Sequence, residues 1–291
     1  MKTALALPVF AALLVAQTMA PPPFVPPPPP VAVPPTFIQM SDPQFGMYTK
    51  NVGFQHETAN FEFAIATVNR WKPAFVVITG DLINEAGNAA QAAEFHRIAG
   101  KLDKSVKLCL VAGNHDVKNE ATPESLAYYR EHFGPDYYSF RSGEIAGIVL
   151  NSNLEKATKN VPDEAAKMEK WFEAELKKAK ASGAKHILVF QHIPFFRKTA
   201  DEPEVYENIP VDVRQRYLKL LHEYGVKWVF AGHQHQNEES RDGDLQVIAT
   251  GPVGMPLHGA KSGMRVVTVG ADGVAHKYYE FGELPETLDG K

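Results

Sequence analysis

Short apolar segments that alternate with stretches of helical spacing constrain the fold of this chain more than any other feature. The segments lie at residues 37–40, 75–79, 108–112, 145–151, 186–191 and 226–231, and they are rich in β-branched and aromatic side chains. Such segments are typical of strands that are buried on both faces of a sheet. Helical spacing marks residues 58–71, 163–181 and 211–224. The chain therefore predicts an α/β core, which ends in antiparallel strands at 245–250, 264–269 and 276–281.

Polar side chains follow five of these strands, at the point where each strand ends. Some of them come directly after a glycine, which permits a tight turn and a close approach of the backbone. In open α/β sheets the ligand site lies beyond the carboxyl ends of the strands, so we expect these side chains to form one site. The residues are Asp42, Gln44, Asp81, Asn114, His115, Asp116, His192, His233 and His235.

The chemistry of these side chains indicates a metal centre. Each histidine alone could be a hydrogen-bonded loop residue, but motifs such as Gly113-Asn114-His115-Asp116 rarely arise by chance. Oxygen and imidazole ligands without a thiolate favour Mn, Fe, Zn or Co. The ligands outnumber what one ion needs, and a shared carboxylate can hold two ions about 3.5–4 Å apart. We therefore expect two divalent or trivalent ions whose activated hydroxide attacks phosphorus.

The N-terminus predicts export. A basic start, an apolar run and small residues at 1–20 are typical of a secretory signal peptide, with cleavage after Ala20 or Ala16, or an uncleaved anchor, as the alternatives. Residues 21–35 are mostly proline and predict an extended linker. Residues 36–291 then form the catalytic domain. We expect a periplasmic or secreted protein, without a transmembrane span beyond this possible signal.

Composition limits the partners and the sources of stability. The formal net charge of −4 gives no reason to expect a nucleic acid as a partner, and we expect a monomer that binds a phosphoester substrate. The single cysteine, Cys109, excludes an intramolecular disulfide. The core or a bound metal must therefore stabilise the fold.

The strand-end motifs resemble those of the calcineurin-like metallophosphoesterase superfamily over residues 37–281. The resemblance implies an α/β/β/α sandwich of two mixed sheets flanked by helices. It also implies that His115 donates the proton to the leaving group and that Asp116 or a neighbouring carboxylate positions it. The implied ligands are Asp42, Gln44, Asp81 and His235 for the first metal ion, and the bridging Asp81, Asn114, His192 and His233 for the second.

One position departs from the superfamily pattern. Gln44 stands where a histidine is usual, and a neutral amide oxygen is a harder ligand than imidazole, so the first ion is expected to bind more weakly or to be a different metal. The glutamine and the Tyr206–Pro210 segment are similar to the branch called calcineurin-like phosphoesterase domain-containing protein 1. That resemblance implies a serine/threonine phosphoprotein phosphatase.

Other readings stay open at this point. Ala112 stands where calcineurin-type phosphatases place a phosphate-binding arginine, and Arg197, Lys198 and Arg241 are candidates for a substitute cation. The leading hypothesis is a dinuclear-metal phosphomonoesterase. The alternatives are a phosphodiesterase acting on cyclic nucleotides or glycerophosphodiesters, and a weakened module that binds metal or phosphate.

Overall fold

The computed structural model describes residues 35–271 and 273–288. The predicted signal peptide and the predicted linker up to residue 34 lie outside the described residues. Along the chain the elements are β1 (Thr36–Met40), α1 (Gln55–Trp71), β2 (Phe75–Ile78), α2 (Ala89–Ala99), β3 (Lys107–Leu110), α3 (Asn114–Val117), α4 (Pro123–His132), β4 (Tyr138–Ser142), β5 (Ile145–Val149), α5 (Asn153–Lys156), α6 (Pro162–Ala181), β6 (His186–Phe190), α7 (Val211–Tyr224), β7 (Trp228–Ala231), β8 (Glu238–Asp242), β9 (Leu245–Ala249), β10 (Gly263–Gly270) and β11 (Gly273–Glu280).

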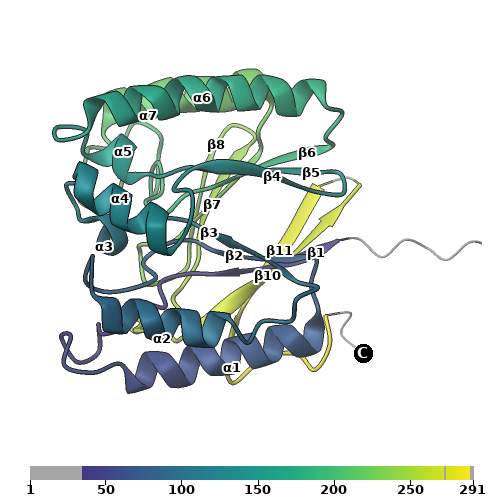
Figure 1. The fold of residues 1–291 in the computed structure, drawn as a ribbon. Coiled ribbons are helices and arrows are strands. Elements are labelled where there is room, and N and C mark those ends of the chain that lie inside the picture. The colour runs from purple at the N-terminus through teal and green to yellow at the C-terminus, as the bar shows by residue number, and fades with distance from the viewer. Residues whose placement is uncertain (1–34, 272, 289–291) are drawn as a thin grey trace, which may run out of the picture. The chain divides into compact units, whose positions relative to one another are not determined.

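The strands form two mixed sheets. The 5-stranded sheet has the order β11-β10-β1-β2-β3, in which β1, β2 and β3 are parallel and β10 and β11 are antiparallel to their neighbours. The 6-stranded sheet has the order β4-β5-β6-β7-β9-β8, with a parallel centre and an antiparallel strand at each edge. The predicted architecture of two mixed sheets flanked by helices is confirmed (Figure 1).

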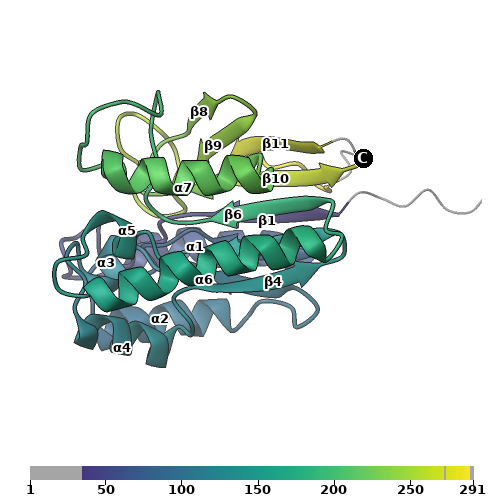
Figure 2. The same cartoon turned by 90° about the horizontal axis from the view of Figure 1, so that it is seen from above.

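The two sheets pack face to face through aromatic side chains. Phe37 of β1 and Phe75 of β2 stack with ring centroids 4.5 Å apart, and Phe37 meets Phe190 of β6 edge to face at 5.8 Å. Helices α1 and α2 cover the outer face of the 5-stranded sheet, and α6 and α7 cover that of the 6-stranded sheet (Figures 1 and 2). This sandwich brings the carboxyl ends of β1, β2 and β3 to the same edge as those of β6 and β7.

Several elements were not expected from the sequence. Helix α2 begins after Asn88, whose side chain accepts hydrogen bonds from the backbone amides of Ala90 and Gln91. Strand β8 has the polar sequence Glu-Glu-Ser-Arg-Asp and carries no apolar segment, because it lies at the edge of its sheet and only Ser240 is buried. Within the described residues, no helix has the length and apolar character needed to cross a membrane.

A buried carboxyl in α5 gives a testable effect on stability. Glu155 is 1% exposed, and neither carboxyl oxygen has a hydrogen-bond partner among the described residues. Burial, and then the charge of Glu169, raise the pKa of Glu155 well above its ordinary value. The native state therefore favours the protonated acid. The resulting stabilisation of the fold is fully present below the unfolded-state pKa of about 4.3, and it is lost as the pH rises through the folded-state pKa.

We expect Glu155→Gln to weaken this pH dependence. Glutamine keeps the shape of the protonated acid and cannot ionise. The free energy of unfolding of the variant, relative to that of the wild type, should therefore increase from pH 5 to pH 9. Urea unfolding at both pH values measures the effect, with Glu173→Gln on the exposed face of α6 as the matched control. An identical pH dependence for the wild type and Glu155→Gln would contradict the assignment.

Candidate metal centre

The predicted site residues lie on the loops that follow β1, β2, β6 and β7 and on the short helix α3, which follows β3, at one edge of the sandwich. The loops are joined by backbone hydrogen bonds: the amide of Asp42 donates to the carbonyl of Gly80 over 3.1 Å, and that of Gln44 donates to the carbonyl of Asp81 over 2.8 Å. The two sheets are linked here as well, because the amide of His233 donates to Asp42 Oδ2 over 3.2 Å. The amide of His115 donates to Asp81 Oδ1, and that of Gly232 donates to the carbonyl of His192, each over 2.9 Å, so the five motifs form one connected structure.

The backbone of this edge is strained where the site residues stand. Left-handed φ values are uncommon for residues other than glycine and cost about 1 kcal/mol or more each. Such strain persists only where the surroundings fix the backbone, and it gathers at functional sites. The left-handed residues here are Asp42 at 49°, Gln44 at 40°, Asp81 at 50°, His233 at 70° and His235 at 52°.

Two glycines permit the close approach of these loops, as the sequence predicted. A Cβ atom on Gly113 would collide with the backbone nitrogen of Asp81, and one on Gly232 would collide with the Ser41 hydroxyl. Any side chain at either position would therefore push the strand-end loops apart. Alanine cannot replace glycine here without moving Asp81 or Asp42.

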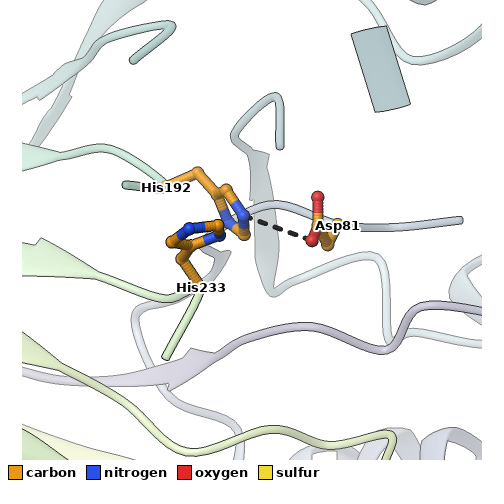
Figure 3. Close-up of side chains that lie close together, drawn as sticks. All are labelled: Asp81, His192 and His233. Atoms are coloured by element: carbon orange, nitrogen blue, oxygen red, sulfur yellow. Dashed lines mark ion pairs between the residues drawn. The ribbon is translucent and has the colours of Figure 1, made fainter. Parts of the chain in front are cut away.

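The side chains gather into two groups that share Asp81. Asp81, His192 and His233 form one group, and Asp42, Asp81 and His235 form the other, with ligand atoms in each group within 4.8 Å of one another. All five residues are buried. Figure 3 shows the first group, in which Asp81 faces the ring of His192 and that of His233 lies beside it.

Atoms with free lone pairs converge in the first group. The Nδ1–H of His192 donates to the carbonyl oxygen of Thr79 over 2.7 Å, which leaves the Nε2 lone pair facing inward. That Nε2 lies 3.0 Å from Asn114 Oδ1 and 3.3 Å from Asp81 Oδ2. Three electron-rich atoms at these distances repel one another unless a positive charge, a proton or a metal ion, lies between them.

The orientation of Asn114 is fixed by its own hydrogen bonds. Its amide nitrogen donates to Asn119 Oδ1 over 2.9 Å and to the hydroxyl of Tyr206 over 3.0 Å, so the amide oxygen must face His192.

The second group is built in a similar way. His235 Nδ1 lies 2.6 Å from the carbonyl oxygen of Met255, and its Nε2 lies 3.4 Å from Asp42 Oδ1.

Three buried atoms of the cluster have no hydrogen-bond partner among the described residues. They are Asp42 Oδ1, Gln44 Oε1 and His233 Nε2. A buried polar atom without a partner costs roughly 1–3 kcal/mol, and buried acceptors are normally satisfied. These acceptors, together with those around His192, fit divalent metal ions in number and chemistry.

The electrostatics of the cluster also favour a positive charge. Burial lowers the pKa of His192, but the adjacent Asp81 carboxylate outweighs it and raises the pKa to about 9. Burial raises the pKa of Asp81, but the nearby His192 and His115 bring it below its ordinary value. Burial and then His192 lower the pKa of His233 to about 3, so its imidazole is neutral and keeps a lone pair.

His115 lies beside the cluster with one ring nitrogen held. Its Nδ1 lies 2.8 Å from the carbonyl oxygen of Asn84, and its backbone amide donates to Asp81 Oδ1 over 2.9 Å. The ring is half-buried, so Nε2 is the nitrogen available to exchange a proton. The expectation that a carboxylate positions this ring is wrong, because a backbone carbonyl takes that place.

Asp116 instead supports the backbone of the neighbouring loops. Its carboxylate accepts hydrogen bonds from the amides of Ile83 over 3.1 Å and Gly113 over 2.8 Å, and the ring of His115 is not among its partners. Burial and the Asp81 charge raise the pKa of Asp116 to about 7. Asp116 therefore joins the β2 and β3 loops rather than orienting the ring of His115.

Some contributors could not be seen in the motifs. Asn84 holds His115 through its carbonyl and accepts a hydrogen bond from Gln44 Nε2 over 3.0 Å through its side chain. The carbonyls of Thr79 and Met255 orient two histidines, and a backbone carbonyl leaves no signal in residue type. Arg197, a candidate for binding phosphate, is paired with Glu238 through its Nε at 2.9 Å.

Comparison with known proteins identifies relatives of this arrangement. The family model described as calcineurin-like phosphoesterase matches residues 35–237. The serine/threonine-protein phosphatase CPPED1 of Bos taurus is 34% identical over 86% of this chain and 85% of its own length, and that of Homo sapiens is 32% identical over the same shares. A dimetal phosphatase from Danio rerio shares the fold with a TM-score of 0.58 and 17% identity, over 86% of this chain and 100% of its own.

Proposed function

The chain belongs to the calcineurin-like phosphoesterase family and is a phosphoric ester hydrolase, and we propose that it hydrolyses phosphoric monoesters with a dinuclear metal centre. The observation that carries the proposal is the pair of ligand groups that share Asp81. One carboxylate common to two groups is the arrangement in which two ions flank a single phosphoryl group.

The proposed ligand sets extend these two groups by Gln44 and Asn114. Divalent ions bound there would act as Lewis acids toward the phosphoryl oxygens and would lower the pKa of water. The first ion would be held by Asp42, Gln44, Asp81 and His235, and the second by Asp81, Asn114, His192 and His233. In the neutral rings of His192 and His235, the carbonyls of Thr79 and Met255 hold the hydrogen on Nδ1, so the inward Nε2 carries a lone pair for a metal ion.

His115 is the proton donor of the proposed reaction. When protonated, the ring donates through Nδ1 to the carbonyl of Asn84, and Nε2 can deliver its proton to the leaving alkoxide. Ester hydrolysis needs a proton donor for the leaving group, whereas a module that only binds metal or phosphate does not. The half-buried position of the ring leaves it open to an ester bound at the cluster.

The substrate class is inferred from the relatives. The proteins that match over most of this chain are described as serine/threonine-protein phosphatases. We therefore infer that the substrate is a phosphoserine- or phosphothreonine-like monoester. Export through the N-terminal signal is a separate part of the proposal, and N-terminal sequencing of the protein recovered from cell fractions tests it.

Parallel assays separate the proposal from its main alternative. Turnover of 4-nitrophenyl phosphate, phosphoserine and bis(4-nitrophenyl) phosphate is measured with added Mn²⁺. We expect kcat/KM for the monoesters to exceed that for the diester. A preference for the diester would favour a phosphodiesterase and reject the monoesterase assignment.

We expect Gln44→His to bind the first ion more tightly. The glutamine oxygen faces the cluster because its amide nitrogen donates to Asn84, and imidazole is a better ligand than a neutral amide oxygen for the candidate transition metals. Histidine is also among the residues that accept the left-handed backbone found at this position.

Calorimetric titration with Mn²⁺ or Zn²⁺ measures the change, and Gln215→His on the exposed face of α7 is the matched control. An unaltered affinity in Gln44→His would argue against Gln44 as a ligand.

A further inference from the structure

Tyr206 lies against the metal-ligand cluster although none of the five strand-end motifs includes it. Its ring centroid is 4.9 Å from that of His233, and its hydroxyl accepts a hydrogen bond from Asn114 Nδ2 over 3.0 Å. The residue nevertheless remains 53% exposed. A tyrosine that served only the core would be buried, so the exposure of this ring beside the cluster calls for another role.

The backbone on both sides of Tyr206 is clamped. Lys156 Nζ donates to the carbonyl oxygen of Val205 over 2.6 Å and to that of Asn208 over 2.9 Å. On the other side, Gln234 Nε2 donates to the carbonyl oxygen of Glu207 over 2.8 Å. Gln234 stands between His233 and His235, so the segment that carries Tyr206 is tied directly to a metal-ligand loop.

Hydrogen bonds of two buried side chains, Asn208 and Arg214, also hold the same segment. Asn208 is fully buried, and its amide nitrogen donates to Glu202 Oε1 over 2.7 Å. The buried guanidinium of Arg214 donates to the carbonyls of Ala200, Glu202 and Ile209. An exposed ring on a backbone held this firmly is positioned before any ligand arrives, which is the arrangement that minimises the entropy lost on binding.

The hydroxyl of Tyr206 can donate to a ligand at little cost. It donates to Asn119 Oδ1 over 3.2 Å, a long hydrogen bond at an exposed position. Asn119 Oδ1 also accepts from Asn114 Nδ2 over 2.9 Å, so it keeps a partner if the tyrosine proton turns away. The hydroxyl hydrogen rotates freely about the C–O bond, and the hydrogen bond that it accepts from Asn114 polarises it as a donor.

We propose that Tyr206 contacts the substrate, and that its hydroxyl donates a hydrogen bond to a phosphoryl oxygen of the ester bound beside Asn114. The nature of the ligand rests on the proposed function, since a phosphomonoester presents anionic oxygens to the cluster. Hydrogen bonds to anionic oxygens are shorter and stronger than those between neutral groups. Arg197, the cation considered for binding phosphate, is already paired with Glu238. The neutral hydroxyl of Tyr206 therefore makes this contact with the phosphoryl oxygen.

Tyr206→Phe tests the proposal because it removes the hydroxyl and keeps the ring against His233. Metal-loaded wild type, Tyr206→Phe and the control Tyr224→Phe are compared, the last being a half-buried tyrosine at the carboxyl end of α7. Binding of inorganic phosphate is measured by calorimetry, metal content by elemental analysis, and kcat and KM with 4-nitrophenyl phosphate. Loss of a hydrogen bond to a charged ligand predicts phosphate binding that is weaker by roughly 10- to 100-fold, with a matching rise in KM.

The metal content of Tyr206→Phe should equal that of the wild type. An unchanged phosphate affinity would overturn the proposal, as would a wild type that binds no phosphate. Loss of metal in parallel with phosphate would also overturn it, because Tyr206 would then act by orienting Asn114. The two proposals can also fail separately. If Tyr206→Phe binds phosphate more weakly but the wild type turns over no ester, the contact is supported and the proposed function is rejected.

Discussion

Asp81→Asn is expected to abolish metal-dependent turnover and to remove most of the bound metal. Asp81 is the one residue common to both ligand groups, and its Oδ2 lies 3.3 Å from His192 Nε2. Asparagine replaces an anionic oxygen with a neutral amide, so both ions lose the charge that holds them. Several kcal/mol of lost transition-state stabilisation correspond to a decrease in kcat/KM on the order of 10³ or more.

The substitution is conservative in shape. The amide oxygen of asparagine can still accept the hydrogen bond that Asp81 Oδ1 receives from the backbone of His115. We therefore expect the fold to persist, and circular dichroism with elemental analysis distinguishes metal loss from unfolding. Asp212→Asn, at an exposed position in the first turn of α7, is the matched control. Two bound ions and near-normal turnover in Asp81→Asn would rule out a bridging role.

His115→Ala is expected to lower turnover by roughly 10²- to 10⁴-fold while the metal content stays intact. The ring lies next to the two ligand groups and belongs to neither of them, and its Nδ1 is held by the carbonyl of Asn84. Its removal takes away the proton for the leaving group and leaves the metal ligands in place.

The size of this loss should depend on the leaving group. An alkoxide such as that from phosphoserine needs a proton, whereas 4-nitrophenolate departs as a stable anion. We expect His115→Ala to lose more turnover with phosphoserine than with 4-nitrophenyl phosphate. His222→Ala, an exposed histidine paired with Asp242, is the control. Equal losses with both substrates would contradict proton donation by His115.

Much of the fold could be predicted from hydrophobic patterning alone. The buried strands β2 and β5 are continuous apolar segments, β6 is apolar after His186, and α7 presents Tyr217 and Leu221 to the core at helical spacing. Patterning fails where burial is one-sided or slight. The edge strand β8 is polar, and α4 has Leu126 and Tyr129 as its buried apolar residues.

The sequence also predicted that the side chains at the strand ends meet in one cluster. This prediction was possible because the type of a residue and its position after a strand can both be read from the local sequence. It could not predict how they are held. The partners of His115, His192 and His235 are the carbonyls of Asn84, Thr79 and Met255, which only the folded backbone brings within reach. The sequence drew attention to the Tyr206–Pro210 segment but could not place Tyr206 beside the cluster, because that position depends on Lys156 and Gln234 from distant parts of the chain.

A metal titration coupled to turnover tests the central claim most directly. Chelator-treated protein is titrated with Mn²⁺, and bound metal is measured beside the hydrolysis of phosphoserine. We expect no turnover before metal is added and full turnover once two ions are bound per chain. Turnover by the metal-free protein, or saturation with a single ion, would contradict the dinuclear centre at Asp81.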